Sequence, residues 1–115
     1  MNDPSCLFCK IAARQIPAKI VHEDDSVVAF EDIHPQAPVH LLVIPRKHLV
    51  SLADSTPEDS PLLGQMLTVA AELARKHHLD KGYRTIINNG ALAGQSVYHL
   101  HVHVMGGRGF QWPPG

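Results

Sequence analysis

The feature of this sequence that most constrains its fold is a regular alternation of histidine and aliphatic residues within residues 98–105. The histidines are His99, His101 and His103. Successive side chains of a β-strand point to opposite faces, so the pattern predicts a half-buried strand with its aliphatic row facing the core. Because histidine titrates near neutral pH, the other row favours proton-transfer chemistry. A solvated histidine face is the structural alternative.

Composition limits the classes of function. With 115 residues, a net charge of −1 and 44% hydrophobic residues, the chain is typical of one globular domain. We expect a flexible N-terminus over residues 1–5 and a single domain over residues 6–115. The sequence has no basic run for nucleic acid and no apolar stretch long enough for a bilayer. The N-terminus lacks the pattern of a signal peptide, so we expect a cytoplasmic protein.

Periodicity and turn residues predict an α+β domain of five strands and two helices. Apolar spacing predicts a short helix over residues 6–13 and an amphipathic one from about residue 56, capped by Ser55 or Thr56, to residues 77–78. The glycine-containing connection before the histidine row implies an antiparallel pair of strands. The expected strands cover residues 19–22, 27–31, 39–44, 83–88 and 98–105.

Polar residues stand where apolar strands meet loops, which is where active sites commonly form. Between its two neighbours, His101 suits a nucleophilic imidazole. Gly90 and Gly94 would let backbone amides approach an anion such as phosphate, although a plain loop fits equally well. Besides the histidine row, the polar residues concerned are His40, Asn88, Gln95 and Ser96.

Two metal sites are also compatible with the sequence. Alternating histidines can supply ligands to a catalytic zinc, although the row offers no carboxylate. Cys6 and Cys9 have the Cys-x-x-Cys spacing of a structural zinc site, which two histidines elsewhere could complete. Two thiols packed under a short helix are the alternative.

The histidine row and much of the remaining chain resemble the histidine triad (HIT) superfamily, and specifically its Hint branch. The stretches that carry the resemblance are 16–19, 29–33, 35–40, 43–45, 94–105, 106–108 and the Trp-Pro-Pro-Gly ending at 112–115. The resemblance implies a HIT-like fold, with a five-stranded antiparallel sheet, one long helix and one short helix. It also implies a homodimer with a ten-stranded sheet.

The implied activity is that of a purine nucleoside phosphoramidase, which cleaves the P–N bond of adenosine or guanosine 5′-monophosphoramidates through a covalent nucleotidyl-histidine. By resemblance His101 is the nucleophile, His103 and His40 hold the phosphate and steer protons, and His99 orients its neighbour. Ser96 contacts the phosphate or leaving group. The nucleotide-binding residues expected with them are Phe8, Ile11, Asp32, Ile33, His34, Asn88, Gly94 and Gln95. His34 stands where many Hint proteins carry a small polar residue beside the ribose.

The resemblance further implies a structural zinc held by Cys6, Cys9, His48 and His99, no catalytic cofactor, and a tail in which Trp112 reaches the partner's active site. The expected partners are purine nucleoside monophosphates and phosphoramidates and a second copy of the chain, with no nucleic acid or membrane. A dinucleoside polyphosphate hydrolase of the Fhit type or a nucleotidyl transferase is the alternative within the superfamily. A catalytically weak nucleotide-binding adaptor and a zinc hydrolase are alternatives of other classes.

Overall fold

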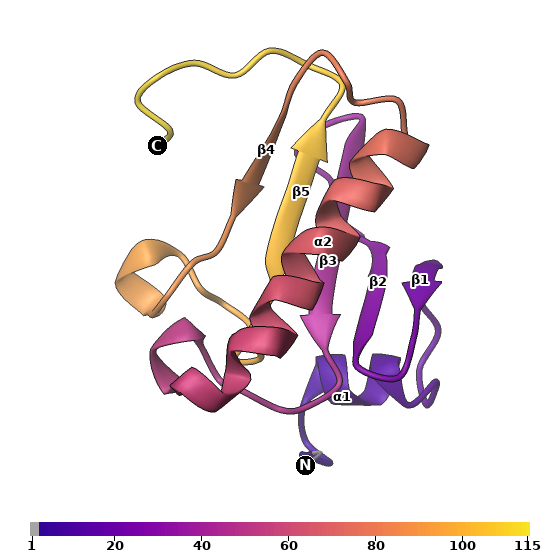
Figure 1. Cartoon of the computed structure of the whole chain (residues 1–115), viewed down its shortest axis with the longest axis vertical. Coiled ribbons are helices and arrows are strands. Elements are labelled where there is room, and N and C mark those ends of the chain that lie inside the picture. Colours follow the sequence, from indigo (N-terminus) through magenta and orange to yellow (C-terminus); the bar gives the residue numbers. More distant parts are fainter. Residues whose placement is uncertain (1–2) are drawn as a thin grey trace.

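Strand β3 (Val39–Pro45) is the central strand of the sheet, because its residues are almost all apolar and both of its faces are covered. The computed structural model describes residues 3–115, and Figure 1 shows the arrangement of its elements. All pairings are antiparallel, in the order β1-β2-β3-β5-β4. The other strands are β1 (Ile20–Glu23), β2 (Val27–Glu31), β4 (Tyr83–Ile86) and β5 (Val102–Gly106). The predicted α+β fold with a five-stranded antiparallel sheet is confirmed.

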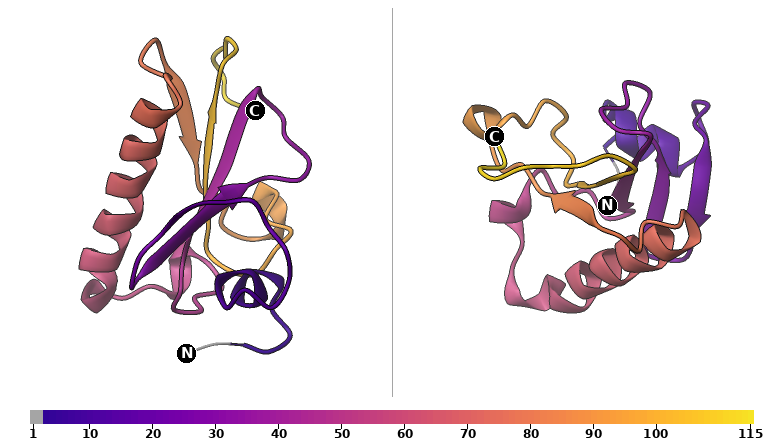
Figure 2. Two further views of the ribbon diagram at one scale, coloured as in Figure 1. Left: turned by 90° about the vertical axis from the view of Figure 1, so that its right-hand side faces the viewer. Right: turned by 90° about the horizontal axis from the view of Figure 1, so that it is seen from above.

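Helix α2 (Ser60–Lys76) lies along one face of the sheet (Figure 2). Its apolar residues recur at spacings of three and four, and they pack on every second residue of the strands. Thr56 and Asp59 form a reciprocal capping box on a 3₁₀ turn (Pro57–Asp59) that leads into the helix. The side chain of His77 lies 2.9 Å from the carbonyl of Leu73 and closes the last turn. The predicted cap at Thr56 is present on the 3₁₀ turn, but the α-helix itself begins at Ser60 and not near residue 56. The predicted end of the helix at residues 77–78 is confirmed.

The short helix α1 (Leu7–Ala12) covers part of the opposite face (Figure 2). Phe8 and Ile11 pack there on the alternate residues of β2 and β3, and the rings of Phe8 and Phe30 meet edge to face with centroids 5.3 Å apart. His40 and His103 belong to this face, because neighbouring positions of paired strands point the same way. The α1 face therefore carries the polar residues, and the α2 face holds the larger apolar core.

The histidine row is only partly a strand, so the prediction of a strand over residues 98–105 is wrong in its first half. Strand β5 begins at Val102, which pairs with Val43 near the end of β3. The last two residues of β3, Ile44 and Pro45, pair only with β2, and the amide of Leu100 donates instead to the carbonyl of Leu49 at 2.7 Å. The alternation of side chains still holds, because Leu100 is buried in the same core cluster as Val102.

The remaining connections are short. The predicted strand over residues 83–88 ends at Ile86, opposite His103, the last pair of its ladder. Of the flexible lead-in predicted over residues 1–5, residues 1 and 2 lie outside the described part, and Ser5 donates from its amide to the carboxylate of Asp3 at 2.9 Å. Two further 3₁₀ turns cover Leu52–Asp54 and Ala91–Ala93. Within residues 3–115, no helix has the length and apolar character needed to cross a membrane.

Candidate active site

A pocket of about 480 Å³ opens on the α1 face, beside the first residues of β5. One side is apolar and comes from α1, the residues that follow it and β2. The other side is polar and comes from the loop after β2 and from the histidine row. The lining residues are Leu7, Phe8, Ile11, Ile16, Pro17, Ala18, Phe30, Glu31, Asp32, Ile33, His34, Gln36, His40, Leu42, Ser96, Val97, His101 and His103. An apolar cleft with a few convergent polar groups is typical of a small-molecule site.

The tautomer of His101 is set by the backbone before it. The ring Nδ1 lies 2.7 Å from the carbonyl oxygen of His99, and a carbonyl can only accept, so Nδ1 carries the proton. In the neutral ring, Nε2 then keeps its lone pair. The ring also lines the pocket, and Phe8 packs edge-on against it with centroids 5.2 Å apart. A buried imidazole with a free Nε2 has the form required of a nucleophile.

His40 and His103 form a second set of linked rings. The backbone amide of Gln36 donates to Nδ1 of His40 at 3.0 Å, so the proton of neutral His40 is on Nε2. That Nε2 lies 2.9 Å from Nδ1 of His103 and 3.3 Å from a carboxylate oxygen of Asp32. His40 therefore donates to His103, and His103 carries its own proton on Nε2. The result is an N–H donor beside the nucleophile.

Burial keeps these two rings neutral. It lowers the pKa of His40, against the opposing charge of Asp32. Burial, with smaller contributions from His101 and His40, lowers the pKa of His103 to about 4. Desolvation disfavours the charged form of an imidazole, so near neutral pH both rings act as neutral hydrogen-bonding groups.

The three histidines of the row do not converge on one point. Within residues 3–115, groups of side chains able to hold a metal occur in two places, and neither place contains all three histidines. One group is Asp32, His40 and His103. There the Gln36 amide donates to Nδ1 of His40, so the nitrogen of His40 that faces Asp32 and His103 is the protonated Nε2. A protonated nitrogen has no lone pair for a metal. The geometry therefore speaks against a catalytic zinc in this pocket.

The other group is Cys6, Cys9, His48 and His99, at the foot of α1. Nδ1 of His99 lies 3.3 Å and 3.5 Å from the two sulfurs and 3.1 Å from Nδ1 of His48. Zinc bonds of about 2.0–2.3 Å in a tetrahedron place ligand atoms roughly 3.3–3.8 Å apart. The four donors, two sulfurs and two imidazole nitrogens, therefore fit zinc in both type and spacing.

The surroundings of this group also fit a metal. Nε2 of His99 donates to the carbonyl of Pro45 at 2.8 Å, which leaves Nδ1 as a lone pair facing the sulfurs. The amides of Cys9 and Asp3 donate to the sulfurs of Cys6 and Cys9, both at 3.4 Å. Such N–H bonds stabilise thiolates. The residues predicted to hold a structural zinc are thus assembled, and the site is compatible with one.

The structure brings most of the predicted catalytic and nucleotide-binding residues together and leaves five of the residues predicted for the pocket outside its lining, one of which, His99, belongs to the Cys/His group. The Gln95 side chain is turned inward, where it bonds the carbonyl of Val50 at 2.6 Å and the amide of Gly90 at 2.8 Å. Trp112 is 86% exposed on this single chain. Gly94 adopts a φ of +97° at a turn, and Asn88 is also outside. The predicted residues that line the pocket are Phe8, Ile11, Asp32, Ile33, His34, His40, Ser96, His101 and His103.

Some lining residues were not predicted from the sequence. Residues 16–18 and Val97 complete the apolar wall, but they are separated along the chain and form no periodic pattern. Gln36 acts through its backbone amide, which leaves no signature in its side chain. The only sequence signal for this role was the Pro-rich stretch around Gln36, because two prolines hold the loop in an extended form and leave its backbone groups open to other partners.

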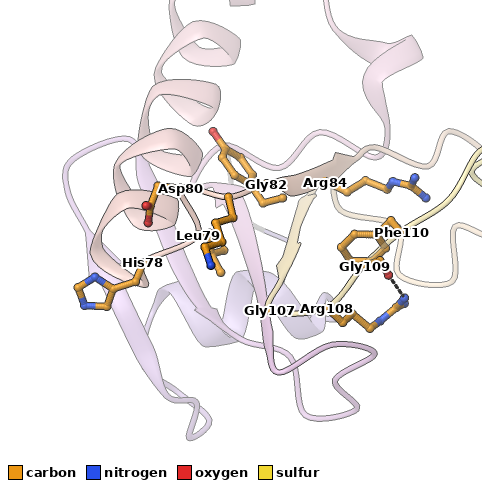
Figure 3. Close-up of a pocket in the computed structure, with 11 residues that line it drawn as sticks. His78, Leu79, Asp80, Gly82, Arg84, Gly107, Arg108, Gly109 and Phe110 are labelled. Atoms are coloured by element: carbon orange, nitrogen blue, oxygen red, sulfur yellow. Dashed lines mark hydrogen bonds between the residues drawn. The ribbon is translucent and has the colours of Figure 1, made fainter.

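A second cavity, of about 690 Å³, lies at the other end of the sheet (Figure 3). It is formed by the residues after α2, the start of β4 and the segment after β5. Leu79, Tyr83, Arg84, Arg108 and Phe110 are among its lining residues, and no triad histidine is. The pocket on the α1 face is therefore the candidate active site.

The chain is similar to known proteins in both sequence and fold. Residues 5–109 match a family model described as "Scavenger mRNA decapping enzyme C-term binding". An uncharacterized HIT-like protein of Synechocystis is 54% identical over 109 residues, covering 95% of this chain and 96% of the relative. A HIT family hydrolase from Legionella pneumophila superposes with a TM-score of 0.95 at 50% identity, covering 96% of this chain and 100% of the other.

Two further solved structures bear on ligands. A histidine triad nucleotide-binding protein from Candida albicans is 35% identical, with a TM-score of 0.81 and coverage of 95% of this chain and 83% of the other. A Zn-bound histidine triad family protein from Mycobacterium smegmatis is 38% identical, with a TM-score of 0.80 and coverage of 90% and 76%.

Proposed function

This chain belongs to the histidine triad (HIT) superfamily, and from that membership we propose that it is a purine nucleoside phosphoramidase. Its neighbours include a HIT family hydrolase and a histidine triad nucleotide-binding protein. The observation that carries the proposal is the hydrogen bond of 2.7 Å from Nδ1 of His101 to the His99 carbonyl, which leaves Nε2 free in the pocket.

In the proposed first step, Nε2 of His101 attacks the phosphorus of a nucleoside 5′-phosphoramidate. The N–P bond to histidine forms as the P–N bond to the amine breaks, and the leaving nitrogen takes up a proton. In the second step water attacks the phosphorus, the bond to His101 breaks, and the water releases a proton. Splitting one displacement into two lowers the barrier of each.

The neighbouring groups support the same chemistry. The N–H of His103 Nε2 can donate to a phosphoryl oxygen, and a donor fixed in advance stabilises charge that develops there. Ser96 lines the pocket and would contact the phosphate or the leaving group. Asp32 keeps one carboxylate oxygen toward His40 while the other accepts from the amide of His34 at 2.8 Å. Its remaining lone pairs can accept the ribose hydroxyls.

The apolar wall would hold the base. Phe8 and Ile11 from α1 and Ile33 from the loop after β2 enclose that part of the pocket. Ile33 is 83% exposed in the free chain, so a base stacked against it would remove apolar surface from water. Apolar contacts do not distinguish the edges of adenine and guanine, and we propose that both purines bind.

The Cys/His group would hold a structural zinc. The metal would cross-link α1 to the sheet and would take no part in catalysis. Cys6 and Cys9 belong to the start of α1 and to α1 itself, while His48 and His99 belong to the loops after β3 and before β5. Helix α1 has only six residues, too few to be stable alone. Since Phe8 and Ile11 are on the same helix, the metal would also hold one wall of the pocket.

We also propose a cytoplasmic homodimer in which Trp112 approaches the partner's pocket. The 86% exposure of this large apolar side chain supports a contact outside the single chain. Its removal in Trp112→Ala should change the preference among amine leaving groups more than the affinity for the nucleoside monophosphate.

The test is hydrolysis of an adenosine 5′-phosphoramidate with a fluorescent amine, by wild type and His101→Gly, with and without chelator. Turnover that survives the chelator and is lost in the variant supports the histidine nucleophile. Mass spectrometry of wild type quenched in alkaline denaturant, in which the bond between histidine and phosphorus survives, should show one added adenylyl group on His101. Turnover of diadenosine polyphosphates but not of phosphoramidates, or monophosphate binding without turnover of either, would contradict the proposal.

A further inference from the structure

The N–H that His103 presents to the pocket depends on a series of hydrogen bonds that begins outside the pocket, at Arg108. The Gln36 amide fixes the proton of His40 on Nε2, and His40 in turn makes Nδ1 of His103 an acceptor, through contacts of 3.0 Å and 2.9 Å. A backbone amide cannot exchange the roles of donor and acceptor, so it sets the direction of both bonds. If the amide moved away, each ring could adopt either tautomer, and His103 could turn a lone pair toward the phosphate.

Arg108 holds the backbone of Gln36 at the next peptide group. Nε of Arg108 donates to the Gln36 carbonyl at 2.9 Å. The same guanidinium donates through NH1 to the carbonyl of Gly109 at 3.0 Å and lies 4.3 Å from the ring centroid of Phe110. Figure 3 shows Arg108 beside Phe110 with the bond to Gly109 dashed. Three contacts thus hold the donor that reaches the loop.

The backbone before Arg108 is fitted to the same loop. Gly107 has a φ of +91°, and a Cβ built there would lie 2.9 Å from Cβ of Pro38. Only glycine combines this φ with this close approach at little cost. The segment after β5 therefore meets the loop before β3 at two adjacent residues, Gly107 against Pro38 and Arg108 against Gln36.

We propose that Arg108 is a positioning residue for the phosphate-binding donor His103, acting through the two peptide groups that flank the Cα of Gln36 and through His40. Arg108 does not line the candidate active site, so it makes no contact with substrate in the pocket. Its effect on turnover rests on the proposed function, whereas its effect on the protonated ring nitrogens does not.

Arg84 provides a matched control. Its guanidinium lies on the same ring as that of Arg108, 4.9 Å from the centroid of Phe110, and it donates to the carbonyl of Gln111 at 2.9 Å. Arg84 makes no hydrogen bond to Gln36. Arg84→Met and Arg108→Met therefore remove the same kind of stacked cation, but only the second removes the bond to the loop.

The experiment measures histidine ring nitrogens by NMR on ¹⁵N-labelled protein at neutral pH. Wild type and Arg84→Met should both show protonated Nε2 and unprotonated Nδ1 at His40 and His103. Arg108→Met should show a mixture of tautomers at both rings, with His101 unchanged. The kcat for the phosphoramidate should fall about tenfold, less than the 100-fold or more that loss of a general acid–base group costs, with KM changed less than about threefold.

Arg108→Lys keeps one donor on a flexible stem and should restore the wild-type tautomers and most of kcat. Identical tautomers and kcat in Arg108→Met and Arg84→Met would overturn the proposal. So would equal losses in Arg108→Lys and Arg108→Met with unchanged tautomers, because that result would indicate a role in folding through Phe110. If wild type does not turn over the substrate, the proposed function fails, and the ring nitrogens still decide the role of Arg108.

Discussion

The two histidine clusters of this domain use the same side chain but present opposite ring nitrogens. In the Cys/His group, His99 donates from Nε2 to the carbonyl of Pro45 and turns Nδ1 toward the sulfurs. In the pocket, His101 donates from Nδ1 to the carbonyl of His99 and keeps Nε2 free. The two residues are two positions apart, and a backbone carbonyl fixes the tautomer of each.

This difference teaches that the pattern of side chains does not by itself assign roles within the row. His99 is fully buried and faces the Cys/His group, whereas His101 and His103 line the pocket. His99 also joins the two sites, because its ring belongs to one and its carbonyl to the other. Variants can therefore separate what each cluster does.

The largest effect should come from His101→Gly. Without the imidazole no nucleotidyl intermediate forms, and we expect turnover to fall by at least about 10⁴-fold, the scale of loss for a nucleophile. The zinc content should equal that of wild type, because the bond to the His99 carbonyl is not part of the metal group. Elemental analysis and steady-state kinetics on the same samples check both statements. A loss of metal together with activity would show that the two clusters are not separable.

Cys9→Ser should affect stability more than chemistry. A ligand present at 1,000 times its Kd stabilises the folded state by about 4 kcal/mol, and this variant should lose that increment with the metal. Urea unfolding of wild type and variant, each with and without chelator, measures the difference. Chelator should lower the unfolding free energy of wild type only. Equal stability of all four samples would exclude a structural metal.

His99→Asn separates the ring from the carbonyl. Removing one of four ligands should weaken zinc binding by at least about 100-fold, beyond the 10–100-fold loss typical of altering an outer-shell partner. The backbone carbonyl that orients His101 remains, so kcat with saturating zinc should stay within about tenfold of wild type. A loss as large as that of His101→Gly would mean that the imidazole of His99 takes part in the reaction.

The fold was predictable from the sequence where a pattern is local. The bounds of β2, 27–31, were predicted correctly, because a run of apolar residues marks the strand and the turn residues beside it mark its ends. The capping box at Thr56 and Asp59 is equally local. The start of β5 was predicted too early, because a strand also needs a partner, and Ile44 and Pro45 at the end of β3 pair with β2 but not with residues 100 and 101.

The candidate site was predictable in its side chains and not in its backbone groups. His40, Asp32 and the triad could be named from residue type and resemblance. The Gln36 amide could not, since its role depends on where the loop lies. The backbone near Gln95 was expected at the phosphate and stays a prediction, while its side chain braces the loop through Val50 and Gly90, a role that the sequence did not indicate. Roles that depend on hydrogen bonds between distant segments need coordinates.

The smallest expected effect is on the pH dependence of the unfolding free energy, and it tests whether the ring of His103 is buried. Burial lowers the pKa of His103 from its ordinary 6.5 to about 4. Between these values the unfolded chain binds a proton that the folded chain does not, so the unfolding free energy falls as pH drops from about 6.5 to 4. The slope for one whole proton is about 1.4 kcal/mol per pH unit, an upper limit because His103 is only partly buried.

In chelator, to keep metal release out of the comparison, His103→Asn should show a shallower slope than wild type in urea titrations across that range. His78→Asn is the matched control. His78 is exposed and has a φ of +60°, a conformation that asparagine tolerates, so its slope should equal that of wild type. Parallel slopes for all three proteins would contradict the buried, neutral state of His103, and with it the fixed N–H donor on which the contrast between the two clusters depends.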